Sequence, residues 1–65
     1  MVENRVKEYR KAAKLTLAEL AERSGVPIST IGDIELGAEP RVITAIRIAR
    51  VLDVNVELLW PVQNK

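Results

Sequence analysis

The side chains that could do chemistry in this sequence are few, and they favour binding over catalysis. The 65 residues include no cysteine and no histidine. This composition excludes nucleophilic catalysis by cysteine or with a histidine base, and it effectively excludes a structural zinc site. We expect no catalytic residue, no metal and no cofactor, so an enzyme is the least favoured hypothesis.

The polar groups of most interest lie in GVPISTIGDIELG, residues 25–37. If this stretch lay in a DNA groove, three of its side chains could contact bases. Ile28 can contact a thymine methyl, Ser29 can donate or accept a hydrogen bond, and Asp33 can accept from the N4 amino group of cytosine. These three residues are therefore our candidates for DNA base contacts, although the stretch lacks the Arg, Lys, Asn and Gln that most often read base edges.

Each candidate in this stretch also has a purely structural explanation. Ile28 could pack at the start of the helix, and the hydroxyls of Ser29 and Thr30 could cap its N-terminus. Asp33 could be a solvated surface acid, or it could repel DNA. The residues alone leave these alternatives open.

Charge is polarised along the chain, although the net charge is only +1. Residues 5–14 contain five basic side chains and one acid, whereas residues 28–39 contain three acids and no base. The basic run could attract DNA over a long range or could be an ordinary solvated helix face. Net charge by itself does not identify a nucleic-acid partner.

The composition is that of one small globular domain, predicted to span residues 1–65. Hydrophobic residues make up 48% of the chain, and 65 residues is near the lower limit for a self-sufficient core. No apolar run approaches the roughly 20 residues of a membrane span, and the charged start is unlike a signal peptide. We expect a soluble, cytoplasmic protein that does not bind membranes.

Hydrophobic periodicity predicts five short helices and no strands. Their expected ranges are about 2–14, 16–24, 27–36, 42–52 and 56–60. In the first helix, Val6, Tyr9 and Ala13 form the expected buried stripe. The fourth helix is apolar at eight of its eleven positions, which predicts burial nearly all round.

The expected helix ends are marked by residues that favour caps and turns. Thr16 with Glu19 three residues later is a capping-box pattern. Gly25 suits a left-handed turn after the second helix, and Pro27 suits the first turn of the third. Asn55 is the expected N-cap of the last helix.

A small residue, a glycine and an aliphatic residue at spacings of four and six are typical of a helix-turn-helix, and here they are Ala21, Gly25 and Ile31. With its surrounding helices, the chain resembles the Cro/phage-repressor family, also called the xenobiotic-response-element family. The segments that carry the resemblance are NRVKEYRKAAKLTLAELAERSGV, STIGDIELG and TAIRIARVLDVNVELLW.

This resemblance implies a compact, all-α, five-helix, lambda-repressor-like DNA-binding domain with the helix-turn-helix at about residues 17–36. It also implies that the third helix lies in the major groove of double-stranded DNA, and that a homodimer binds a palindromic operator.

The resemblance further implies a structural ion pair between Arg10 and Glu35. A cationic partner would also explain why an acid stands at a helix C-terminus, where the helix dipole disfavours it. The chain departs from the family at Leu17, where members usually have Gln, and in the loop after Gly37, which is often rich in Lys or Arg. We expect phosphate contacts from four residues, namely Thr16, Thr30, Arg41 and Lys14.

Apolar residues remain near the C-terminus after the expected core is filled. We predict a dimer interface in segment 56–63, formed by Val56, Leu59, Trp60 and Val62, with Ile43 as a possible neighbour. The alternative is that the residues around Trp60 merely cover the small core.

The leading hypothesis is a sequence-specific DNA-binding transcriptional regulator that acts as a homodimer. The alternative hypothesis is a protein-interaction module, of adaptor or antitoxin type, that uses the apolar and acidic face of the third helix and binds DNA weakly or not at all.

Overall fold

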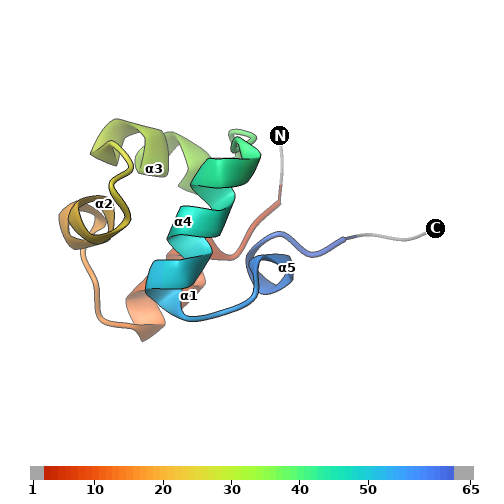
Figure 1. The fold of residues 1–65 in the computed structure, drawn as a ribbon, viewed down its shortest axis with the longest axis horizontal. Helices are drawn as coiled ribbons and strands as arrows, with labels where there is room; N and C mark the ends of the chain where they lie inside the picture. Colours follow the sequence, from red (N-terminus) through yellow and green to blue (C-terminus); the bar gives the residue numbers. More distant parts are fainter. Residues whose placement is uncertain (1–2, 63–65) are drawn as a thin grey trace.

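The structure, a computed structural model of the chain, describes residues 3–62. Five α-helices occur in this range, which confirms the predicted all-α, five-helix fold (Figure 1). In chain order they are α1 (Val6–Ala12), α2 (Leu17–Ser24), α3 (Ile28–Glu35), α4 (Val42–Leu52) and α5 (Val56–Leu59).

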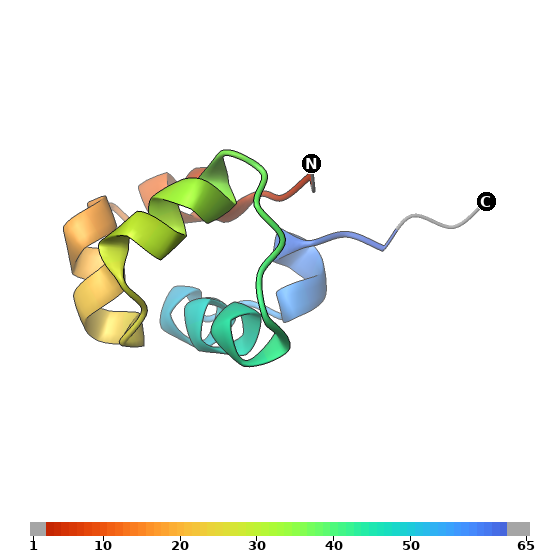
Figure 2. The same cartoon turned by 90° about the horizontal axis from the view of Figure 1, so that it is seen from above.

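The helices enclose one aliphatic core to which every helix contributes. α2 packs against α3 and α4, α1 packs against α3, and α5 packs against α4. Figures 1 and 2 show α2 and α3 at one end of the bundle and α5 at the other. The largest fully buried side chains are Val6, Leu20, Ile31, Ile34, Ile48 and Leu59. Burying each such side chain contributes about 1.5–3 kcal/mol, so these residues supply much of the apolar stabilisation of the fold.

α1 is shorter than the sequence predicts, and its start is set by tertiary contacts. The Val6 N–H donates to Asn4 Oδ1 over 3.1 Å, and the Arg5 N–H donates to the Leu59 carbonyl over 2.8 Å. These bonds hold the chain before Val6 in a non-helical conformation, with Arg5 at φ of −116° and ψ of 25°. Val2, the predicted first residue, lies outside the described range.

The other end of α1 is also earlier than predicted, because Lys14 adopts a left-handed conformation with φ of 61°. The Leu15 N–H then donates to the Arg10 carbonyl, and the Lys14 N–H donates to the Lys11 carbonyl. This is the Schellman arrangement that satisfies the last carbonyls of a helix. The prediction that Ala13 is buried is wrong, because the turn leaves it exposed.

The prediction that α4 is buried nearly all round is also wrong. Its inner face, formed by Ala45, Ile48, Ala49 and Leu52, is buried. Its outer face leaves Val42, Ile43 and Ile46 exposed, at 77%, 61% and 38%. The bundle covers α4 from one side only. Its apolar residues are therefore divided between a buried face in the core and an exposed face.

The structure of α5 shows that Leu59 was wrongly predicted to lie in the dimer interface. Leu59 is 0% exposed, because it belongs to the core between α1 and α4, and its side chain is not available to another molecule. Val62 is 71% exposed, whereas Val56 and Trp60 are half-buried against the core. Asn55 is the N-cap residue of α5, although its side chain does not form a cap hydrogen bond within residues 3–62.

Among residues 3–62, no helix combines the length and the apolar character that crossing a membrane requires. The same range does not bring together three or more side chains of the types that could hold a metal ion.

Candidate nucleic-acid interface

The turn between α2 and α3 has the geometry of a helix-turn-helix. Thr16 Oγ1 accepts the Glu19 N–H over 3.0 Å, and Glu19 Oε1 accepts the Thr16 N–H over 2.8 Å, which confirms the capping box at the start of α2. The hydrogen bond from the Thr16 N–H to the Glu19 carboxylate lowers the pKa of Glu19, because it favours the charged form. Gly25 ends α2 in a left-handed conformation with φ of 73°, as expected.

α3 has two faces with different roles. Ile31 and Ile34 are buried and fix the helix on the core. The outer face exposes Ile28, Ser29 and Asp33, the three predicted base-contact residues, so the structure brings them together on one accessible surface. Ile28 is 49% exposed, so it is only partly packed at the helix start.

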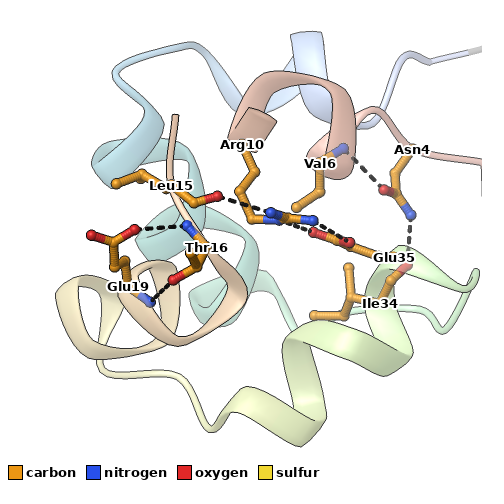
Figure 3. A network of polar contacts seen from close by, with 8 residues as sticks. All are labelled: Asn4, Val6, Arg10, Leu15, Thr16, Glu19, Ile34 and Glu35. Atoms are coloured by element: carbon orange, nitrogen blue, oxygen red, sulfur yellow. Dashed lines mark hydrogen bonds and ion pairs between the residues drawn. The ribbon is translucent and has the colours of Figure 1, made fainter. Parts of the chain in front are cut away.

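A buried ion pair fixes the C-terminal half of α3 to α1 (Figure 3). Arg10 donates to both carboxylate oxygens of Glu35, with Nε–Oε2 at 2.7 Å and Nη2–Oε1 at 3.2 Å. Its third donor, Nη1, binds the Leu15 carbonyl at 2.8 Å. The hydrogen bond to Glu35 raises the pKa of Arg10, so the guanidinium stays charged. The predicted ion pair is therefore present in a bidentate form.

The last turn of α3 is held by further backbone contacts that orient its outer face. Asn4 Nδ2 donates to the Ile34 carbonyl over 2.8 Å, which connects the start of α1 to the end of α3. The N–H groups of Gly37 and Ala38 donate to the carbonyls of Ile34 and Asp33, and Gly37 has φ of 113°. Together these bonds define where α3 ends.

A groove of about 480 Å³ runs beside α3 and is closed on its other side by the start of α4 and the connection before it. Three predicted DNA-contact residues, Thr30, Asp33 and Arg41, line it. Two acids and two arginines contribute charge to its wall, namely Asp33, Glu39, Arg41 and Arg47. The groove therefore borders the outer face of α3 and carries no net charge.

The other two predicted phosphate-contact residues lie at the start of α2. Lys14 and Thr16 are both exposed. The Thr16 hydroxyl accepts a hydrogen bond from the Glu19 N–H. The structure thus divides the predicted phosphate contacts into a group beside α2 and a group in the groove between α3 and α4.

Two residues of this region were missed by sequence reasoning. Asn4 positions α3 through a contact between residues 30 apart in the chain, for which the sequence holds no local signal. Arg47 lines the groove beside Thr44. The polar residues of α4, Thr44, Arg47 and Arg50, recur at a spacing of three, which was a signal that Thr44 and Arg47 share a face.

Comparison with known proteins identifies the family of this arrangement. A family model described as helix-turn-helix matches residues 6–59. The chain is 39% identical over 61 residues to the HTH-type transcriptional regulator SinR of Bacillus subtilis (strain 168). That alignment covers 91% of this chain and 55% of SinR, so the chain spans about half the length of this curated relative.

Solved structures of SinR have the same fold. The N-terminal DNA-binding domain of SinR from Bacillus subtilis is 36% identical, with a TM-score of 0.83 over 94% of this chain and 91% of that domain. A crystal structure of SinR, the master regulator for biofilm formation, in complex with DNA is 40% identical. It has a TM-score of 0.77 and covers 82% of this chain and 87% of that one.

Proposed function

We propose that this chain, which belongs to the helix-turn-helix family, binds double-stranded DNA through α3 and regulates transcription. The observation that carries the proposal is the exposed outer face of α3, which is fixed by the core and by the Arg10–Glu35 ion pair. SinR, which has the same fold, has been solved in complex with DNA, and this similarity supports DNA binding by the present chain.

In this proposal α3 lies in the major groove and reads few base edges. Ser29 hydrogen-bonds to a base, Asp33 accepts from a cytosine amino group, and Ile28 contacts a thymine methyl. None of these residues makes the bidentate Arg–guanine or Gln–adenine pair, each worth about 1–3 kcal/mol of discrimination. Phosphate contacts from Lys14 and Thr16 therefore supply a large share of the affinity, with Thr30 and Arg41 on the groove side.

The regulator acts as a homodimer on a palindromic operator. α3 has eight residues, so it is about 12 Å long and one copy reaches few base pairs. Two copies related by a twofold axis place their α3 helices about 34 Å apart, which is one turn of DNA. Exposed apolar residues in and after α5 support this dimer. Because Leu59 is buried, we assign its place in the interface to Leu58, which is 45% exposed. Val56, Trp60 and Val62 remain in the proposed interface.

The dimer is tested by sedimentation analysis of the Leu58→Lys variant. We expect the substitution to shift the protein towards monomer, because it places a charge in an apolar interface. Ala12→Lys is the control, since Ala12 is exposed on α1. A protein that is monomeric at all concentrations and on DNA would contradict the dimer.

DNA binding is tested by fluorescence anisotropy with mixed-sequence duplexes at low and rising salt. We expect binding whose logarithmic affinity falls linearly with the logarithm of salt concentration, because phosphate contacts release counterions. Selection from random duplexes then gives the operator and its half-site spacing. Asp33→Ala should relax the preference at one base pair. A uniform gain in affinity would show instead that Asp33 only repels phosphate.

A second candidate function is recognition of a protein, as in an adaptor or antitoxin. Exposed apolar side chains where α3 ends and α4 begins favour it, because Leu36, Val42 and Ile43 are 78%, 77% and 61% exposed. No binding to any duplex at low salt and micromolar protein would select this candidate.

A further inference from the structure

We propose that the groove between α3 and α4 holds a phosphodiester of one DNA strand and that Arg47 is the residue that makes this possible. The inference rests on the proposed DNA binding and deepens it. Arg47 was not among the predicted phosphate contacts, and its role follows from where α4 places it.

The first observation is the position of the Arg47 side chain. Its Nη1 lies 3.4 Å from the point that a Cβ at residue 25 would occupy. The guanidinium thus lies against the turn that leads into α3, although Arg47 is anchored on α4 and is exposed. A cation is held beside the start of the helix that faces DNA.

The second observation is which edge of α3 borders the groove. Thr30 and Asp33 are three residues apart, so they share the edge that faces α4. Glu35 is on the opposite edge, where it binds Arg10 of α1. The outer face of α3 is therefore flanked on one side by the groove, and any molecule seated on that face extends towards it.

The size of the major groove of DNA explains why a phosphate must come near this edge. The groove is about 12 Å wide, and a helix with its side chains is about 10–12 Å in diameter. When α3 fills the groove, the two sugar-phosphate backbones lie along its two edges. The backbone on the α4 edge then meets the side chains that line the hollow between α3 and α4.

The charge of the groove decides whether it can accept that backbone. Asp33 and Glu39 contribute two negative charges, and Arg41 contributes one positive charge. Without Arg47 the groove would have a net charge of −1 and would repel a phosphodiester, whereas Arg47 brings the sum to zero and offers five N–H donors. Arg47 therefore removes the net repulsion on this side of α3 and supplies the donors that a phosphodiester needs.

The experiment compares Arg47→Gln with Arg50→Gln, using anisotropy titrations of mixed-sequence duplex DNA over about 50 to 200 mM salt. Both arginines are exposed on α4, and each substitution removes one positive charge. Arg50 is the matched control because it lines a separate hollow beside Asn55 and Leu58. Thermal melts of both variants confirm that each is folded.

We expect Arg47→Gln to reduce the slope of log affinity against log salt by about 0.9 for each bound chain, and Arg50→Gln to leave the slope unchanged. Arg47→Lys should restore the slope, because the lysine keeps the charge. Equal slopes for wild type and Arg47→Gln, or equal losses in both variants, would overturn the phosphate site and leave the proposed DNA binding intact. Absence of wild-type binding would instead overturn the proposed function itself.

Discussion

Removing the positive partner of the buried ion pair should remove a large share of the stability of this domain. In the Arg10→Met variant, the Glu35 carboxylate loses both of its hydrogen bonds from the guanidinium, and the Leu15 carbonyl loses the third. The side chains of Arg10 and Glu35 are only 9% and 7% exposed, so water cannot replace these bonds. Leaving one charge of a buried pair without its partner costs about 3–5 kcal/mol.

That cost is large compared with the stability expected for the whole chain. A domain of 65 residues has a free energy of unfolding of about 3–10 kcal/mol. For a domain of this size, 1 kcal/mol changes the melting temperature by about 4–8 °C, so Arg10→Met should lower it by at least about 12 °C.

The assay is thermal unfolding followed by far-ultraviolet circular dichroism, with urea unfolding to obtain the free energy. The control is the double variant Arg10→Met/Glu35→Leu. Because it leaves no buried carboxylate, it should recover most of the lost stability. An Arg10→Met variant that melts within about 3 °C of wild type, well under the shift for 1 kcal/mol, would refute the reasoning.

Three further predictions concern local structure. Gly32→Ala should raise the free energy of unfolding by up to about 1 kcal/mol in urea titrations, because Gly32 lies inside α3 and, apart from its neighbours and the helix's own backbone, no described atom lies within 4 Å of its Cβ position. Asp53 ends α4 at φ of 58°, so Asp53→Gly should stabilise the domain and Asp53→Val should destabilise it by about 1–2 kcal/mol, measured in the same way. The pKa of Glu19 is lowered in the folded state, so its capping contribution is present above its ordinary pKa and is lost as pH falls through the lowered value. The difference in melting temperature between wild type and Glu19→Gln should accordingly shrink in acid, and a difference that does not depend on pH would contradict this assignment.

The residues of the helix-turn-helix show how far local spacing can predict structure. Thr16 and Glu19 are three residues apart, so their hydrogen bonds form within one helical turn and depend on little else. Gly25 meets a backbone requirement that most side chains cannot meet. These local features placed α2, the turn and α3 to within a residue or two.

The candidate site was predictable where it follows from helical periodicity. Ile28, Ser29 and Asp33 do share the outer face of α3, because a helix with Ile31 and Ile34 in the core must expose the opposite side. Whether these side chains bind DNA is a separate question that the proposed titrations address.

Tertiary structure decided the features that depend on which surfaces meet. The sequence of α4 is apolar on both sides, and only the arrangement of the bundle selects Ile48 for the core and leaves Ile43 exposed. In the same way, Leu59 and Val62 are both aliphatic, yet one is fully buried and the other is largely exposed.

The sequence by itself determined the order of the five helices, the capping box of α2 and the turn after it, because those depend on interactions between residues a few positions apart. Only the tertiary structure decided the ends of α1, the exposed side of α4 and the place of Arg47 beside the turn. Asn4 and Ile34 are 30 residues apart, and Arg10 and Glu35 are 25 apart. Contacts over such separations form only when packing of the core brings the helices together, so local periodicity does not specify them.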